Sequence, residues 1–317
     1  MAFCAVEMRA KRKAEGGAGM CFARSWSMER VVESILLISA LSSALIVFFI
    51  VLFMLKEGFP ALMLGKDFFL GMEWKPSHDK FGILPTVIST LIVGVGALAI
   101  SAAIGIPAAI YLAEFSPPFL RNVLKACVEM LVGVPSVVLG FFGLMVVVVF
   151  IRDFFGGGGG GGGGECILAA WFILAIMTLP HVVSISEDAI QAVPRSLREA
   201  SLALGATHWQ TVREVVLPNA RSGILASLIL GMGNAIGETM AVLMVIGNPN
   251  IPSVPTSVFD AARVLTSTIV LEIPYAMWGS THQHALFALG IVLFAIVAFL
   301  NIITTAIVRR EVRKKSV

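Results

Sequence analysis

The chain has 317 residues, of which 57% are hydrophobic and only 14% charged, and its mean hydropathy is +0.91. Because ordinary soluble domains carry about 25% charged residues, this composition argues against a water-soluble enzyme. It also excludes intrinsic disorder of the whole chain, which requires low hydrophobicity and high net charge, since the net charge is only +3. The four cysteines are scattered without a CxxC pair and predict neither a disulfide framework nor a zinc site.

The chain begins with a segment that differs from everything after it. Residues 1–27 are basic and glycine-rich, whereas Met28 opens the sequence MERVVESILLISA, which leads into an apolar run. A secretory signal peptide would have an apolar region of only about 7–15 residues, shorter than this run. We predict that residues 1–27 are either a disordered extension or sequence upstream of the true start. The membrane domain is then expected at 28–310, and a basic cytoplasmic tail at 311–317.

Six segments are long and apolar enough to cross a bilayer, which requires about 20 mostly apolar residues. Several contain Gly or Pro, which membrane helices tolerate better than soluble ones. A soluble helical core would instead show shorter segments separated by charged faces. We therefore predict an all-α polytopic membrane protein with six transmembrane helices. The predicted spans lie near residues 31–55, 83–112, 126–151, 166–185, 223–246 and 285–308.

The basic residues predict the orientation of these spans. Most of the 23 Lys and Arg residues precede span one, separate spans two and three, separate spans four and five, or follow span six. Because loops rich in Lys and Arg remain in the cytoplasm, both termini are predicted to be cytoplasmic.

One face of the second span carries small residues at helical spacing. They are Gly94, Ala97, Ser101 and Gly105. Small side chains let neighbouring helices approach closely, so this stripe predicts tight helix packing.

The segment between spans four and five, residues 187–222, has the pattern of a compact helical hairpin. Pro194 is suited to the start of a helix, and Leu197, Ala200 and Leu204 then share one face. Gly205 allows a turn, and a second short helix is expected at 208–216. An apolar ridge of this kind suits a groove on another protein or a lipid surface, and composition alone does not distinguish them.

Small and polar residues recur along one face of the fifth span, at Ser227, Gly231, Asn234 and Glu238. An ionised carboxylate at mid-membrane costs about 2.5–3.5 kcal/mol, so Glu238 must face protein or water. It is expected to line a pathway or to form an interhelical ion pair or hydrogen bond. Ser136 in span three follows a proline, which frees a backbone carbonyl. The predicted translocation path comprises Glu238, Asn234, Thr239 and Ser136.

The sequence EASLALGATHWQTVREVVLPNA resembles the EAA loop of bacterial and archaeal ABC-importer permeases. Ser201 replaces the second alanine of that motif, while the glycine and the aliphatic-x-Pro ending are retained. The resemblance implies the type I, MetI-like permease fold and a loop that docks into a cleft of a cytoplasmic ATPase. The residues implied in ATPase coupling are Glu199, Ala200, Gly205, Leu217 and Pro218.

The sequence GNAIGETMAV at 233–242 is similar to the PstC-type permeases of phosphate importers, as are FGILPTVISTL at 81–91 and VGVPSVVLGFFGL at 132–144. This resemblance implies ATP-driven import of inorganic phosphate across a bacterial or archaeal cell membrane. It also implies three partners: a second, PstA-like permease, a PstB-like ATPase dimer and an external PstS-like phosphate-binding protein. Asn234 stands where the family has an arginine, so sulfate, molybdate or tungstate stays open as the cargo.

Other functional classes lack their sequence patterns. The chain has no Walker A sequence and so cannot supply the ATPase itself, no cofactor is expected on it, and ATP is used by the partner. The HExxH and GxSxG patterns of hydrolases are missing, and no nucleic-acid partner is expected. An ATP-independent channel or carrier, which would need no EAA loop, and a subunit that signals phosphate status remain alternatives.

Overall fold

The computed structural model describes residues 2–63, 65–155 and 163–315, with side chains described at 31–63, 65–155 and 163–306. These residues form helices and one short hairpin, in which β1 (Trp74–Lys75) pairs antiparallel with β2 (Lys80–Phe81). The helices are α1 (Ala2–Leu62), α2 (Lys66–Leu70), α3 (Leu84–Ile110), α4 (Pro118–Met130), α5 (Ser136–Phe142), α6 (Val149–Phe155), α7 (Ile167–Gln191), α8 (Arg195–Ala203), α9 (His208–Thr211), α10 (Leu217–Gly237), α11 (Met240–Val245), α12 (Leu265–Glu272) and α13 (Thr281–Lys315). Single π-helical turns extend α3, join α5 to α6 and join α9 to α10.

Six helical stretches of the described residues are long and apolar enough to cross a membrane, which confirms the predicted all-α fold. Their exposed surface is rich in Leu, Ile, Val and Phe, as expected of side chains that face lipid. The stretches are Val31–Leu62, Leu84–Phe115, Ser136–Phe155, Ile167–Gln191, His208–Gly237 and Thr281–Ala306.

The third and fifth spans differ most from their predicted bounds. The third starts at Ser136 instead of residue 126, because Pro135 forces Val134 into extended backbone (φ −76°, ψ 125°) and separates α4 from α5. The fifth starts at His208 instead of residue 223, since α9 continues without a break into α10, and it ends at Gly237 instead of residue 246.

The chain divides after Lys56 into two compact units. The first consists of α1 up to that residue, and residues 2–27, predicted as disordered or as upstream of the start, belong to this helix. They contain no proline and many good helix formers, which accounts for the helix. The true start at Met28 stays a prediction. At the other end α13 includes residues 311–315 of the predicted tail.

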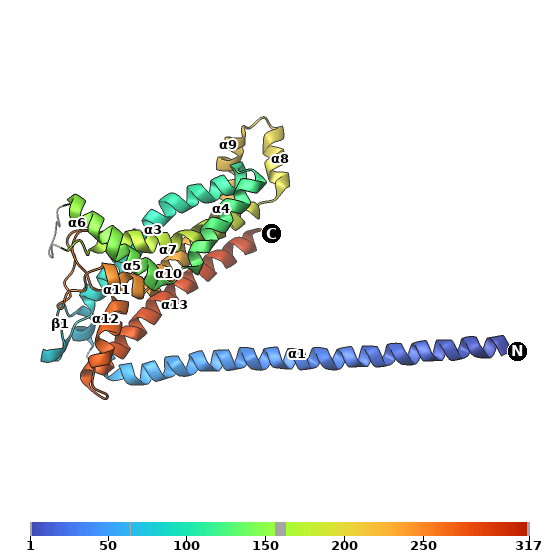
Figure 1. Ribbon diagram of the computed structural model, residues 1–317, viewed down its shortest axis with the longest axis horizontal. Coiled ribbons are helices and arrows are strands. Elements are labelled where there is room, and N and C mark those ends of the chain that lie inside the picture. The colour runs from blue at the N-terminus through green and yellow to red at the C-terminus, as the bar shows by residue number, and fades with distance from the viewer. Residues whose placement is uncertain (1, 64, 156–162, 316–317) are drawn as a thin grey trace. The chain divides into compact units, whose positions relative to one another are not determined.

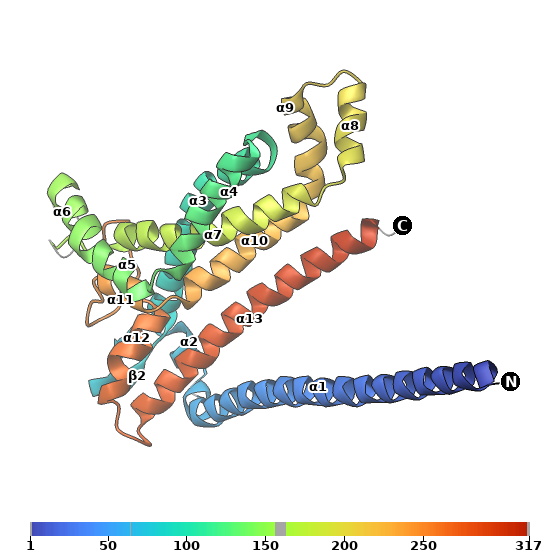
Figure 2. The same cartoon turned by 45° about the vertical axis from the view of Figure 1, so that its right-hand side comes forward.

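The core of the second unit is built by α3, α7 and α10, which pack against one another (Figures 1 and 2). The predicted stripe on α3 is buried in this packing, as its spacing indicated. A Cβ at Gly94 would lie 2.9 Å from Ile236 of α10, and one at Gly105 would lie 3.0 Å from Val182 of α7. Small residues are therefore required where the three helices approach.

Functional features gather at the two ends of this unit. The α8–α9 hairpin projects beyond the ends of α7 and α10 (Figure 2). The β1–β2 hairpin and α12 lie at the opposite end, which we call the distal end (Figures 1 and 2). The long helices α3, α7 and α10 run between these ends and connect them mechanically.

Candidate functional site

The turn between α8 and α9 is fixed by Gly205, whose φ of +87° lies in the left-handed region. Its N–H donates to the Leu202 carbonyl (3.0 Å), and the Ala206 N–H donates to the Ser201 carbonyl (3.3 Å). These two bonds form a Schellman motif, which ends a helix most favourably with glycine at this position. The turn predicted at this glycine is confirmed.

The predicted apolar ridge of α8 is exposed in the described chain. Leu204 is 89% exposed and Leu197 is 40% exposed, while Ala200 and the neighbouring Glu199 are also exposed. Trp209 on α9 adds a further exposed apolar side chain. An apolar surface of this kind on a polar-flanked hairpin fits contact with another protein.

Polar bonds that the sequence did not indicate hold this hairpin at its base. Arg198 forms an ion pair with the buried Glu114 after α3 (2.9 Å) and donates to the Ile190 carbonyl (2.8 Å). The Ser201 hydroxyl lies 2.9 Å from that of Thr211. Serine at the position of the motif's second alanine thus ties α8 to α9.

A second polar cluster holds the start of the hairpin segment to α4. The side chain of Glu187 is fully buried and lies 2.8 Å from Arg121 and 3.2 Å from Lys125. Lys125 also lies 3.1 Å from Asp188. Burial lowers the pKa of Lys125, but its hydrogen bonds to Asp188 and Glu187 outweigh this effect and raise the pKa. The four charges fasten α4 to the end of α7.

Leu217 and Pro218, the predicted end of the loop motif, are the first two residues of α10. The π-helical turn 212–216 continues directly into them, and the Leu217 N–H donates to the Val212 carbonyl five residues before it. Pro218 has no N–H to donate, and it lies where this π-helical turn already interrupts the α-helical hydrogen-bond pattern. The hairpin is therefore joined to α10 without a flexible connection.

Glu238 lies at a break in the fifth span and not on a continuous helix face. Its backbone is extended (φ −69°, ψ 131°), so α10 ends at Gly237 and α11 starts at Met240. The carboxylate accepts a bond of 3.4 Å from the Ala241 N–H. A carboxylate at a helix N-terminus is favoured by the helix dipole.

The predicted shared face of span five is only partly supported. Ser227 is buried and its hydroxyl lies 2.8 Å from that of Ser186 on α7, and Gly231 packs on the same helix. Asn234 is exposed, and Glu238 lies beyond the end of the helix. The predicted face assumed that the helix of span five continues to residue 246, whereas the helix is broken at Glu238.

The other two predicted path residues lie near this break. Thr239 is half-buried and its hydroxyl donates to the Gly237 carbonyl (3.3 Å). Ser136 is half-buried at the start of α5, and α5 packs against α11 so closely that a Cβ at Gly140 would lie 2.9 Å from Ala241. The path residues therefore lie on packed neighbours, although among the described side chains no hydrogen bond joins Ser136 to Glu238.

The distal end contains a polar cluster centred on Glu272, the last residue of α12. Its carboxylate accepts bonds from the indole of Trp74 (2.9 Å) and from the guanidinium of Arg263 (2.6 Å), and lies 2.7 Å from His282. Arg263 is only 6% exposed. The cluster fastens α12 to the β-hairpin and to the start of α13.

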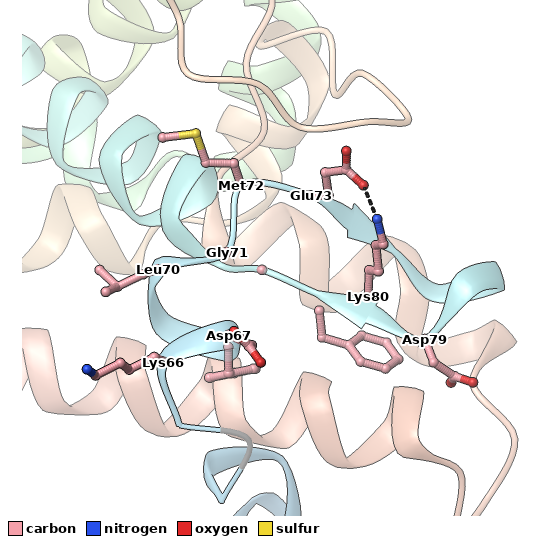
Figure 3. Close-up of a pocket in the computed structure, with 11 residues that line it drawn as sticks. Lys66, Asp67, Leu70, Gly71, Met72, Glu73, Asp79 and Lys80 are labelled. Carbon is pink, nitrogen blue, oxygen red and sulfur yellow. Dashed lines mark hydrogen bonds and ion pairs between the residues drawn. The ribbon is translucent and has the colours of Figure 1, made fainter.

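A cavity of about 550 Å³ lies beside this hairpin at the distal end (Figure 3). It is lined by residues 66–68, 70–73 and 79–82. Lys80 donates to Glu73 across the strands at 2.9 Å (Figure 3). That hydrogen bond and the charge of Lys75 lower the pKa of Glu73. The mixed charges of the lining do not indicate a particular small ligand.

Six apolar spans, small-residue packing and an exposed hairpin joined to the fifth span define a polytopic membrane protein with a surface suited to contact with another protein. Residues 105–314 match the family model described as "binding-protein-dependent transport system inner membrane component". The chain belongs to this family and is an ABC-importer permease located in the inner membrane.

Several named relatives agree with this family. The chain is 40% identical over 239 residues to "Probable ABC transporter permease protein YqgH" of Bacillus subtilis, covering 75% of each chain. It is 36% identical over 247 residues to "Phosphate transport system permease protein PstC" of Mesorhizobium japonicum, covering 73% of this chain and 75% of the relative. Among solved structures, an inward-facing MetNI methionine transporter chain has a TM-score of 0.55 and 22% identity, covering 72% of this chain and 95% of its own. This last likeness shows the fold alone and confirms the predicted MetI-like architecture.

Membership of this family indicates which subunit of the complex carries out each step. A permease of this family has no ATPase site of its own and binds no cofactor, and a partner ATPase hydrolyses ATP. A separate binding protein delivers the cargo. The predicted permease class and the partner ATPase and binding protein are thereby confirmed.

Proposed function

We propose that the chain is one of two permease subunits of an ATP-driven importer of inorganic phosphate. Its similarity to phosphate permeases named PstC, at 36% identity over most of both chains, is the observation that carries this proposal. PstA-like, PstB-like and PstS-like proteins are then the partners, and both termini lie in the cytoplasm. The distal end faces outward, where a phosphate-binding protein delivers its cargo.

The proposed ATPase contact is the ridge of α8, with Glu199, Ala200 and Gly205 at its centre. Its exposure supports this role, since Leu204 is 89% exposed and packs against no described neighbour that would compete. The rigid continuation through Leu217 and Pro218 into α10 supports transmission of ATPase movement to the membrane.

The ATPase contact can be tested with matched charge substitutions. Leu204→Asp should abolish co-purification of the ATPase subunit without loss of permease, because an exposed position does not contribute to the fold. Ile251→Asp is the control, since Ile251 is 54% exposed at the distal end and should leave binding unchanged. Normal ATPase binding by Leu204→Asp would contradict the proposed contact.

The proposed pathway follows Asn234, Glu238, Thr239 and Ser136. Among the described side chains no cation pairs with Glu238, so its charge repels an anion unless a cation of the second permease faces it. Asn234 is exposed on this chain and can donate hydrogen bonds to phosphate oxygens.

Uptake by the reconstituted complex tests both the pathway and the cargo. Labelled phosphate should enter vesicles only with ATP and binding protein, and excess sulfate, molybdate or tungstate should not compete. Competition by one of these anions would favour it as the cargo. Glu238→Gln keeps an oxygen that accepts the bond from the Ala241 N–H but removes the negative charge. Asn234→Arg adds a positive charge. Unchanged uptake in both variants would exclude this part of span five from the pathway.

A further inference from the structure

The break in the fifth span is hydrogen-bonded to α12. Because the backbone at Glu238 is extended, its carbonyl leaves the helical hydrogen-bond ladder. The hydroxyl of Thr266, in the first turn of α12, donates to this carbonyl at 3.2 Å. Thr266 is 4% exposed, so the bond lies away from solvent. This hydroxyl therefore ties the end of α10 to α12.

A second hydroxyl ties the same turn of α12 to α3. The Leu265 N–H, one of the unpaired donors at the start of α12, donates to the hydroxyl of Thr90 at 3.0 Å. Thr90 in turn donates to the Thr86 carbonyl of its own helix at 2.6 Å, so both functions of the hydroxyl are used. Thr90 is 3% exposed. We call Thr90 and Thr266 together the hydroxyl latch.

The latch lies at the end of a continuous mechanical element. From His208 the fifth span runs without a break to Gly237, and at its start it carries the α8–α9 hairpin. A displacement of the α8–α9 hairpin should therefore move Glu238, whose carbonyl accepts the bond from Thr266. Beyond the latch, α12 is fastened by Glu272 to Trp74 and Arg263, so it moves with the distal end.

We propose that Thr90 and Thr266 are positioning residues that hold α3, α10 and α12 together in the closed arrangement of the distal end, and that movement of the hairpin by the ATPase releases them. This inference rests on the proposed coupling of the hairpin to the ATPase, but not on phosphate as the cargo. Neither hydroxyl touches the cargo in this role. Each sets the position of α12 relative to the break at Glu238.

The chain offers a matched control in the same turn. Thr268 is buried like Thr266, but its hydroxyl donates to the carbonyl of Val264, the N-cap residue of the same helix, at 2.8 Å. Thr266→Val and Thr268→Val therefore remove equivalent hydroxyls from one turn, and only the first breaks a bond between helices. Thr266→Ser keeps the donor and should behave as the wild type.

The test measures the distance between spin labels at Leu271 on α12 and Leu230 on α10, both partly exposed, in the complete complex. The wild type should show a short distance without nucleotide and a longer one after trapping with ATP and vanadate. Without nucleotide, Thr266→Val and Thr90→Val should raise the ratio of long to short distances by about 2- to 12-fold, the range that one net hydrogen bond supplies. In the same variants the rate of ATP hydrolysis measured without binding protein should also rise.

Three results would overturn the latch. They are an unchanged distance ratio in both valine variants, an equal shift in Thr268→Val, and a wild-type distance that does not respond to ATP. Thermal unfolding of each variant reports a merely structural effect, which would move the melting temperature and leave the distances in place. Failure of the wild type to import phosphate leaves these distances unaffected, so it would refute the proposed cargo alone.

Discussion

Substituting alanine at Gly205 tests how the conformation of one residue controls ATPase binding. At φ +87° an L-residue with a Cβ is strained, whereas a Cβ at this position would meet no atom within 4 Å. The penalty is therefore the left-handed backbone alone, about 1–2 kcal/mol. A difference of one or two kcal/mol changes a population ratio about 5- to 30-fold, so the ratio of hairpins with the present turn to hairpins without it should fall by this factor.

We expect Gly205→Ala to weaken binding of the ATPase subunit to the permease in nanodiscs by about 5- to 30-fold. Titration of labelled ATPase against the permease measures this directly. Gly205→Asn should lie between alanine and wild type, because asparagine enters the left-handed region more readily than other L-residues. The control is Gly233→Ala within α10, where a Cβ also meets no atom within 4 Å and φ is negative.

Equal affinity of Gly205→Ala and wild type would refute this reasoning, since it would mean that the turn is not part of the bound conformation. An equal loss in Gly233→Ala would refute it differently, because alanine stabilises an ordinary helical position relative to glycine. The reasoning is supported only if Gly205→Ala weakens ATPase binding and Gly233→Ala does not.

Further substitutions test individual polar contacts. Glu187→Gln leaves Arg121 without a carboxylate and Lys125 with Asp188 alone, so the free energy of unfolding should fall by about 1.5–3 kcal/mol. Asp188→Asn, at a largely exposed ion pair, should cost at most about 1 kcal/mol, and thermal unfolding in detergent compares the two variants. Trp74→Phe keeps an aromatic ring but removes the donor to Glu272. Hydrogen exchange of the β-hairpin amides should quicken about 5- to 150-fold, corresponding to a loss of about 1–3 kcal/mol. Hydrogen bonds from the backbone N–H groups of Ser257 and Thr256 lower the pKa of Asp260. The ionised carboxylate therefore stabilises the fold above the ordinary Asp pKa near 3.9, and this contribution is lost as the pH falls through the lowered pKa. Asp260→Asn should abolish that acid dependence in melting temperatures measured between about pH 2 and 5.

The hairpin could be predicted from the sequence because its determinants are local. Leu197, Ala200 and Leu204 are related by helical spacing within eight residues. The helix ends at Gly205 through two local bonds, from the Gly205 N–H to the Leu202 carbonyl and from the Ala206 N–H to the Ser201 carbonyl. The stripe on α3 was predictable for the same reason, since small side chains at helical spacing define a contact face before the partner helix is known.

The break at Glu238 was not predictable from the same periodic pattern. Hydropathy stays high on both sides, and spacing arguments assume a continuous helix, so they extended span five to residue 246. Gly237 before Glu238 was the available local indication, since glycine weakens a helix interior. What holds the break is the Thr266 hydroxyl, 28 residues away, and no short-range pattern contains that information.

Sequence distance explains why the two most charged clusters were missed while the loop motif was found. Trp74 and Glu272 are separated by 198 positions, and Arg121 and Glu187 by 66. Each charge taken alone predicts only a solvated loop residue. Burial makes an unpaired carboxylate expensive, so a partner must exist. Only the packing of α4 on α7 and the position of Trp74 beside the end of α12 identify that partner. The parts of the permease that transmit movement between its ends are therefore those in which distant segments meet, and a mutational study of coupling should begin with these contacts and not with the motif.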